Sequence, residues 1–518
     1  MHAAASLVAA LPRPGRRAVT MVADAARRTI SRRSFLGVVA GTATAGCSHP
    51  RRTAIPGVRT AGPAPAGARK PIAIGCIAPF TGPDAAVGNR AEAALAVALA
   101  HIDNDLAGSY LGYHPTVVHS DAPLTAADGI KAYRDLTAQK VDAILWCGAP
   151  GLEEALPDIV RDLLPVIAVG TDLQGRVPFD AQVPDLSTPA ASGLPVFQTA
   201  VPDTAAVDLL LDYAHRDRGF GRVALLFSTT SHRGMDVYFD AACKHWGVAN
   251  AGVIGFDSAG GAADLMPPVQ ALKGTGAPAV VVLGSAREAA AAAVALDAIG
   301  ARYVDSATAR SGAFHPMLLG GARSVGDALF ARAAAGHAAV GSVGAGALVE
   351  FAGLPEFPLR DWFRRFPPKS GGAVMIGGEE GPVDGLAAIV TAAARAGSKD
   401  GADLVAALES GVEVTFASSV PFSFGTGRHL ALATEDLVLT SLEVPPGGPY
   451  NLGQEWAKGY LPAGFLGPDL LVDFTLDRNR RAHQATMDAI LAGRFGISAR
   501  PDYQDNNPGK VAACRSVH

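Results

Sequence analysis

The sequence has little charge, and the charge it has is balanced. Its 518 residues include 44 lysines and arginines and 48 aspartates and glutamates, which gives a formal net charge of -4 at pH 7. This balance provides no basic face for nucleic acid and no field that would steer a polyanion. Charged residues make up 18% of the chain and hydrophobic residues 49%. We therefore expect a globular protein, large enough for two or three domains, with no nucleic-acid partner.

Motifs for nucleotide, metal or nucleophile chemistry are missing. The turn after the first predicted strand, residues 75–83, holds two prolines and no G-x-G-x-x-G pattern, and the chain has no P-loop pattern. The 13 histidines are scattered, without H-E-x-x-H. Residues 322–326 approach a G-x-S-x-G elbow, but Ala322 stands where that tight turn needs its first glycine. We therefore expect neither an enzyme nor a cofactor or metal site.

Cysteine is scarce, with five residues and no C-x-x-C spacing among them. Cys47 belongs to the N-terminal region considered next. Cys76 and Cys147 end two strands that should be neighbours in a sheet. A disulfide between them and a pair of buried thiols are both compatible with this placement, and both remain open at this point.

The N-terminal apolar run, residues 35–46, is too short to span a membrane, because its 12 residues compare with the roughly 20 that a spanning helix needs. An arginine pair at 32–33 precedes it, and small residues lead into Cys47 at its end. The arrangement resembles a twin-arginine signal peptide with a lipoprotein cleavage box. We expect residues 1–47 to direct export, a lipid on Cys47 to anchor the protein to the outer face of the cell membrane, and residues 48–70 to form a flexible tether.

Short apolar strands alternate with helical segments from residue 71 onward. Strands that are apolar throughout favour a parallel sheet covered by helices on both faces. The units run from residue 71 to 169 and start again after a proline-rich break at residues 174–195. This predicts two doubly wound α/β lobes, over 71–198 and 203–342, rather than one large sheet. The predicted strands are 72–78, 116–119, 143–146 and 166–169 in the first lobe and 223–227, 253–256, 279–283 and 317–319 in the second.

The remainder of the chain is too short for a third lobe. We expect residues 346–420 to return to lobe one, residues 421–443 to make a third crossover, and residues 444–518 to form a C-terminal extension with a disordered end. The predicted fold class is therefore two Rossmann-like α/β lobes joined by a three-strand hinge. The late helices are predicted at 382–396 and 402–409.

Several short stretches carry a likeness to one protein family. They are residues 71–75 and 80–83 with Gly88, the helical stretches 383–388, 394–400 and 404–408, and the strand and turn at 421–424 and 427–429. Together they resemble type I periplasmic-binding proteins, and within them the branched-chain amino-acid (Leu/Ile/Val) receptors of ABC importers. The likeness extends over about 71–443. It implies a two-lobed receptor that closes on a small ligand and delivers it to ABC permease subunits.

The resemblance implies a ligand site formed by loops from both lobes. In lobe one these loops supply Phe80, Thr81, Trp146, Gly148, Ala149, Thr171 and Asp172, and in lobe two Ser231, His232, Gly321 and Arg323. The chain departs from the family pattern where lobe two should hold a carboxylate for a ligand ammonium, since residues 320–323 contain none. An unpaired ammonium in a closed cleft would cost several kcal/mol. Arg323, Arg233 and His232 would suit an anionic ligand, and Asp172 is a candidate for the missing carboxylate.

These features predict an exported solute-binding lipoprotein that captures an amino acid, an amide or an organic acid for an ABC importer. A ligand sensor or non-transport lipoprotein on the same fold is the first alternative. An enzyme on an α/β scaffold is the second, and it would require a nucleophile and a base in contact.

Overall fold

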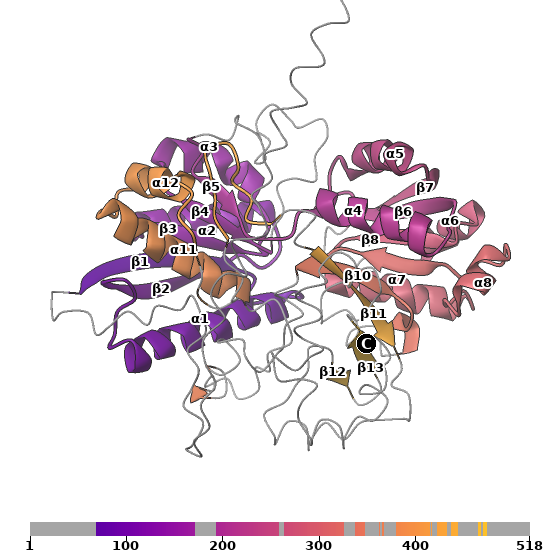
Figure 1. Cartoon of the computed structure of the whole chain (residues 1–518), viewed down its shortest axis with the longest axis horizontal. Helices are drawn as coiled ribbons and strands as arrows, with labels where there is room; N and C mark the ends of the chain where they lie inside the picture. The colour runs from indigo at the N-terminus through magenta and orange to yellow at the C-terminus, as the bar shows by residue number, and fades with distance from the viewer. Residues whose placement is uncertain are drawn as a thin grey trace, which may run out of the picture. The chain divides into compact units, whose positions relative to one another are not determined.

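The computed structural model describes residues 69–170, 193–257, 264–325, 337–347, 380–414, 422–432, 437–443, 465–467 and 470–473, together with residues 362, 365, 366 and 416. These residues form two parallel α/β sheets, each covered by helices on both faces (Figure 1). The predicted fold class, two doubly wound lobes, is confirmed. In the part of the chain that the structure describes, no helix is both long and apolar enough to cross a membrane.

Lobe one is a five-stranded parallel sheet in the order β2-β1-β3-β4-β5. Alternate residues of each strand point to opposite faces, so the sheet has two separate cores. Helices α1, α11 and α12 cover one core, which includes Ile74 and Leu145, and α2 and α3 cover the other, which includes Ile144 and Trp146. The strands are β1 Lys70–Ala78, β2 Tyr113–Asp121, β3 Ala143–Cys147, β4 Val166–Val169 and β5 Val196–Gln198. The helices are α1 Ala85–Asp105, α2 Ala126–Ala138, α3 Leu152–Asp162, α11 Glu380–Ala396 and α12 Gly401–Glu409.

Lobe two is an eight-stranded sheet in the order β12-β13-β11-β10-β9-β8-β6-β7. The strands from β10 to β7 are parallel, whereas β11, β12 and β13 pair antiparallel. Helices α4 and α5 pack on one face and α6 and α7 on the other. The strands are β6 Arg222–Ser228, β7 Ala249–Phe256, β8 Ala279–Leu283, β9 Met317–Gly320, β10 Val343–Ala347, β11 Leu437–Glu443, β12 Phe465–Gly467 and β13 Leu470–Asp473. The helices are α4 Asp203–Asp212, α5 Met235–Trp246, α6 Met266–Thr275, α7 Ala286–Ala298 and the short α8 Ser306–Arg310.

Side-chain hydrogen bonds mark where α2 and α7 begin. Thr125 accepts the amide N–H of Asp128 while Asp128 accepts the amide N–H of Thr125, so a capping box starts α2. Ser285 and Glu288 form the same box at the start of α7. Two predicted helix starts differ from the structure. The start of α6 was predicted at residue 262 and lies later, at Met266, and the start of α11 was predicted at residue 382 and lies earlier, at Glu380.

The sequence did not predict α4, which opens lobe two, or the late strands β12 and β13. β10 lies in the lobe-two sheet, although residues from 346 onward were predicted to belong to lobe one. β12 and β13, from the predicted C-terminal extension, extend that same sheet through β11. The return of the chain to lobe one is visible in α11 and α12, which pack against β1, β3 and α1. The lobe and linker limits remain predictions.

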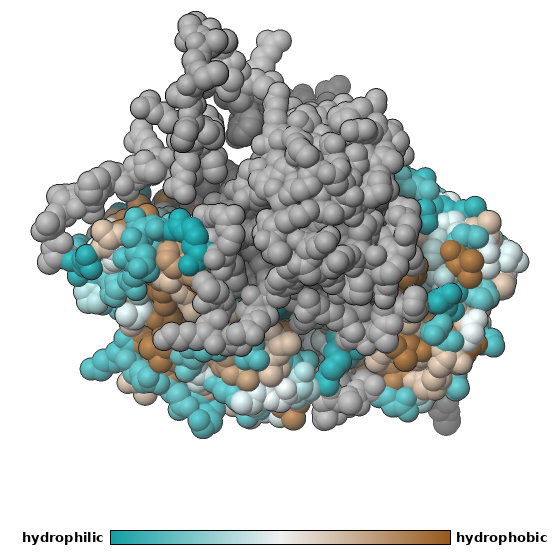
Figure 2. Space-filling model, turned by 90° about the horizontal axis from the view of Figure 1, so that it is seen from below, coloured by the Kyte–Doolittle hydropathy of each residue, from teal (hydrophilic) through white to brown (hydrophobic). Residues whose placement is uncertain are grey.

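The outer surface that the structure describes is mixed in character. Figure 2 shows hydrophilic residues over much of it in that view, with hydrophobic ones in between. The large hydrophobic side chains that are exposed are scattered along the chain: Leu111, Leu124, Val160, Leu163, Val237, Val294 and Val304. Single exposed apolar residues of this kind need no binding partner to explain them.

The segment that leaves lobe one and the segment that returns past residue 422 are joined by hydrogen bonds. The Gln198 N–H donates to the carbonyl of His429 at 2.8 Å, and the Ala431 N–H donates to the carbonyl of Gln198 at 2.9 Å. The His429 ring is fully buried and stacks on Phe197, with ring centroids 4.2 Å apart. These contacts join the end of β5 to residues 429–431, while the three predicted crossings remain a prediction.

Both nitrogens of the His429 ring face acceptors. Nδ1 lies 2.8 Å from the carbonyl oxygen of Val196, and Nε2 lies 2.9 Å from Oε1 of Glu409. Since a carbonyl only accepts, Nδ1 is the donor to Val196, while Nε2 faces the carboxyl group of Glu409. We call Val196, Glu409 and His429 the hinge cluster.

Replacing His429 by Ala should lower the free energy of unfolding by about 2–4 kcal/mol, because it leaves a cavity beside Phe197 and removes the partner of a partly buried carboxyl group. Urea denaturation at pH 7 measures this. The matched control is His245→Ala on the exposed side of α5, which should change stability by less than about 0.5 kcal/mol. Equal unfolding midpoints for His429→Ala and the parent would show that the hinge cluster contributes nothing.

Candidate ligand-binding site

The predicted site residues of lobe one lie in loops at the carboxyl ends of its strands. Phe80 and Thr81 follow β1, and Gly148 and Ala149 follow β3. Because β1 and β3 are neighbours in a parallel sheet, their carboxyl ends lie at the same edge and the two loops start side by side. Thr171 and Asp172 fall outside the described residues, so their part in the site stays a prediction.

Asp121, at the end of β2, holds the loop after β1. Its Oδ1 accepts the amide N–H groups of Phe80 at 2.8 Å and Thr81 at 3.2 Å, and its Oδ2 accepts the Thr81 hydroxyl at 2.5 Å. Three bonds to one carboxylate fix the backbone of this loop and direct the Thr81 hydroxyl toward Asp121. The sequence analysis missed Asp121. Its position at the end of the strand next to β1 was the signal that could have identified it.

Trp146 supports the loop after β3 from within the core of lobe one. Its indole is fully buried in the core between the sheet and helices α2 and α3, and Nε1–H donates to the carbonyl of Ala149 at 2.7 Å. Gly148 has φ of +68°, a conformation that favours glycine, and its N–H donates to the carbonyl of Val169 at 2.8 Å. In this conformation Trp146 therefore positions Ala149, while a direct ligand contact from its indole remains a prediction.

Cys76 and Cys147 lie beside each other in this lobe as free, buried thiols. Their sulfur atoms are 3.9 Å apart on neighbouring strands, where Cys76 is in register with Leu145. The contact with Cys147, and then burial, raise the pKa of the Cys76 thiol well above its usual value. Of the two possibilities left open by the sequence, the structure has the pair of buried thiols.

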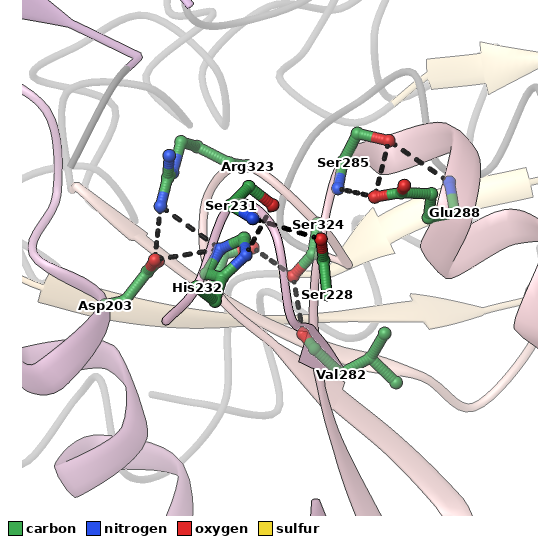
Figure 3. Close-up of polar contacts among 10 residues, drawn as sticks. Asp203, Ser228, Ser231, His232, Val282, Ser285, Glu288, Arg323 and Ser324 are labelled. Atoms are coloured by element: carbon green, nitrogen blue, oxygen red, sulfur yellow. Dashed lines mark hydrogen bonds and ion pairs between the residues drawn. The ribbon is translucent and has the colours of Figure 1, made fainter. Parts of the chain in front are cut away.

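In lobe two the predicted residues converge with one that was not predicted. Ser231 and His232 lie on the loop after β6, Gly321 and Arg323 follow β9, and Asp203 is the first residue of α4 (Figure 3). His232 Nε2 lies 3.0 Å from Asp203 Oδ2, and Arg323 forms an ion pair with the same oxygen. We call Asp203, His232 and Arg323 the lobe-two ion cluster. Arg233, the other arginine considered from the sequence, is exposed on the loop before α5.

The cluster is buried but open on one side. The side chains of Asp203 and His232 are 4% exposed and that of Arg323 is 22% exposed. Ser231 is exposed, and its Oγ lies 2.9 Å from His232 Nδ1. Gly321 leaves room for the carboxylate, since a Cβ there would lie 3.3 Å from Asp203 Oδ1. A ligand reaching this cluster would therefore meet Ser231 and Arg323 before the buried pair.

Electrostatics keep Asp203 ionised despite its burial. Burial alone raises the pKa of a carboxyl group, but the Arg323 guanidinium and His232 outweigh it and hold the pKa of Asp203 well below its usual range. Asp203 also lies in the first turn of α4, where negative charge is favoured by the helix dipole. Lobe two therefore holds a carboxylate that the sequence analysis did not find, but Asp203 is already paired with Arg323 and His232. Asp172 as the carboxylate for a ligand ammonium stays a prediction.

The contacts of Ser324 test whether residues 322–326 form a nucleophile turn of the serine-hydrolase kind. Its hydroxyl is buried and lies 2.9 Å from the carbonyl of Val282 and 3.1 Å from that of Gly321. These bonds fasten the loop after β9 to β8, so this hydroxyl is not presented as a nucleophile (Figure 3). Among the described residues no group of His, Cys, Asp and Glu has the arrangement of a metal site.

Replacing Asp203 by Asn should destabilise the protein by about 3 kcal/mol at pH 7, because it leaves the Arg323 charge buried without its counter-ion. Since the folded pKa of Asp203 is depressed, its stabilisation is complete above the unfolded value of about 3.9 and is lost as pH falls toward the folded one. In denaturation experiments between pH 7 and pH 3, the free energy of unfolding of Asp203→Asn should fall less steeply with decreasing pH than that of the parent. The control Asp297→Asn, at an exposed position of α7, should show the same pH dependence as the parent. If Asp203→Asn also showed the parent's pH dependence, the cluster would not stabilise the fold.

Comparison with known proteins gives the family. Residues 71–442, well over half of the chain, match the periplasmic binding protein family. No curated protein matches the chain. Solved structures share the fold at low identity. A solute-binding protein of an ABC transporter from Rhodopseudomonas palustris BisB5, in complex with 3,4-dihydroxybenzoic acid, is 18% identical with a TM-score of 0.57, over 73% of this chain and 94% of that one.

Two further structures extend this comparison. A solute-binding protein from R. palustris in complex with 4-hydroxybenzoate is 14% identical with a TM-score of 0.58, over 73% of this chain and 94% of that one. A leucine-binding protein from Thermotoga maritima MSB8 is 16% identical with a TM-score of 0.54, over 72% and 95%. At such low identities the solved structures show a shared fold and nothing more. The sequence match over residues 71–442 assigns the family, and the chain belongs to the periplasmic binding proteins.

Proposed function

We propose that this protein is an extracytoplasmic receptor that captures a small polar organic molecule and presents it to the permease subunits of an ABC importer. Family membership supports the receptor role. The observation that carries the site is the convergence, at the carboxyl edge of the lobe-two sheet, of Ser231, His232 and Arg323 around a buried carboxylate. Polar side chains converging at strand ends are typical of ligand sites in α/β folds.

The described part of lobe one supplies backbone groups. The amides at the start of α3 offer N–H donors, and Asp121 holds Phe80 and Thr81 in place. Glu153 and Glu154 lie in the first turn of α3 and reduce the field of that helix. The ligand classes proposed are amino acids, amides and organic acids. The solved relatives are complexes of hydroxybenzoates or are named for leucine, and both kinds fall within these classes.

A thermal-shift screen of the purified chain with leucine, amides and hydroxybenzoates tests the proposal. A ligand at 100 times its dissociation constant should add about 2.7 kcal/mol of stability. Asp121→Asn should weaken binding of the active ligand several-fold, because it loosens the loop that carries Phe80 and Thr81. Asp135→Asn, at an exposed position on α2, is the matched control. No stabilisation by any class, or equal affinity in Asp121→Asn, would contradict the proposed site.

We propose in addition that the protein is exported by a twin-arginine signal and anchored by a lipid on Cys47. The support is the arginine pair at 32–33, the short apolar run and the small residues before Cys47, all of which lie outside the described residues. The extracytoplasmic location itself follows from the family.

Replacing Cys47 by Ala should move the protein from the membrane fraction to the soluble one, because no lipid can then be attached. Replacing both arginines at 32–33 by lysine should prevent export altogether. Fractionation with a carbonate wash, followed by immunoblotting, measures both, and Cys514→Ala is the control cysteine variant. A Cys47→Ala protein that stays with the membrane would rule out the lipid anchor.

A further inference from the structure

We propose that the ligand carries a carboxylate, that lobe two binds it through Ser231 and Arg323, and that His232 takes up a proton when it binds. This inference rests on the proposed function, since it assigns a ligand class to the same site. It follows from the hydrogen-bond roles that the geometry imposes on His232.

One nitrogen of His232 has a fixed role. Nε2 lies 3.0 Å from Asp203 Oδ2, and the carboxylate of Asp203 is ionised, so Nε2 carries a hydrogen and donates it. The guanidinium of Arg323 also approaches Nε2, at 3.2 Å, but arginine only donates. The two donors therefore share Asp203 as their acceptor, and Nε2 remains protonated whatever the charge of the ring.

The other nitrogen is free to change state. Nδ1 lies 2.9 Å from the Ser231 hydroxyl, which can donate or accept. When the ring is neutral, Nδ1 accepts the hydroxyl hydrogen of Ser231. When the ring is protonated, Nδ1 donates to Ser231 Oγ, and the hydroxyl hydrogen turns away from the ring. His232 thus changes its charge without losing a hydrogen bond.

This exchange couples the proton to an anion. Ser231 is exposed, so the hydroxyl hydrogen released on protonation points to where a ligand would arrive. The charge of the lobe-two ion cluster is zero with a neutral ring, because Asp203 balances Arg323, and becomes +1 with a protonated ring. A bound carboxylate would accept the Ser231 hydroxyl and neutralise the added charge. By linkage, the anion favours the proton and the proton favours the anion.

The net charge of the lobe-two ion cluster also disfavours a ligand ammonium group beside Ser231 and Arg323. Asp203 is already paired with Arg323 and His232, so a ligand cation would meet a cluster of zero or positive charge. The other charged groups around His232 belong to adjoining elements, and three of them have partners of their own. Asp208 binds Tyr238 and Trp246, Asp257 accepts the Thr230 hydroxyl, Glu288 caps α7, and Arg233 and Asp236 lie at the start of α5.

Calorimetry with matched probes tests the inference. The probes are benzoate against benzamide and isovalerate against isovaleramide, which differ in charge but hardly in shape, measured with the full-length chain between pH 5.5 and 8.5. We expect a carboxylate to bind at least about tenfold more tightly than its amide at pH 5.5, with the difference shrinking as pH rises. Titrations in buffers of different ionisation enthalpy should show uptake of up to one proton.

Three variants separate the coupling from a structural role. His232→Asn should abolish the proton uptake and flatten the pH dependence, even where some affinity is kept. Ser231→Ala should keep the fold and lower the affinity for the carboxylate more than for the amide. His245→Asn, exposed on α5, should behave as the parent.

Two results would overturn the inference. One is an amide that binds as tightly as its carboxylate across the pH range, or the absence of carboxylate binding altogether. The other is a pH dependence that survives in His232→Asn. Stabilisation by an amide that lacks a carboxylate, with no carboxylate-bearing ligand bound, would leave the proposed receptor function standing and remove the inference alone, whereas failure of every ligand class in the thermal-shift screen would remove both.

Discussion

Parallel strands cannot be joined by tight turns, and most of this architecture follows from that constraint. The connections from β1 through β4 and from β6 through β9 pass through helices, and the carboxyl ends of neighbouring parallel strands lie at one edge of each sheet. The loops there need no regular hydrogen bonding and can carry polar side chains. In lobe one this edge brings together the loops after β1 and β3, and in lobe two those after β6 and β9. Residues about 90 positions apart, such as His232 and Arg323, meet for this reason.

The sequence predicted well what depends on the alternation of apolar strands and helices. Strands such as Ala279–Leu283 and Val166–Val169 were predicted at their observed limits, because they are apolar throughout and bounded by turn residues. The late return to lobe one was predicted from the helices that became α11 and α12. The antiparallel strands β12 and β13 were not predicted, because their place in the sheet is set by pairing with β11 and with each other rather than by a pattern within each segment.

The site was predicted only in part, for a related reason. Ser231, His232 and Arg323 were predicted from the family resemblance, because they lie in loops after strands of lobe two. Asp203 was not, because it begins a helix that the sequence reading had not recognised, and its role arises from contacts with residues 29 and 120 positions away. The same applies to Asp121, whose three bonds to the loop after β1 form only once β1 and β2 are paired. Lobe two thus holds a buried carboxylate that residues 320–323 do not supply, and it is already paired with Arg323 and His232.

The hydrogen bonds between Gln198 and residues 429–431 bear on how the lobes can move. Two segments bonded edge to edge behave as a ribbon: they bend readily across their common plane and resist shear within it, because sliding one past the other would break the bonds at Gln198. The buried ring of His429 adds to this resistance, since it is attached to one segment and stacked on the other. Opening and closing would then be confined to nearly a single axis, so the two binding edges would meet again in the same alignment on every cycle.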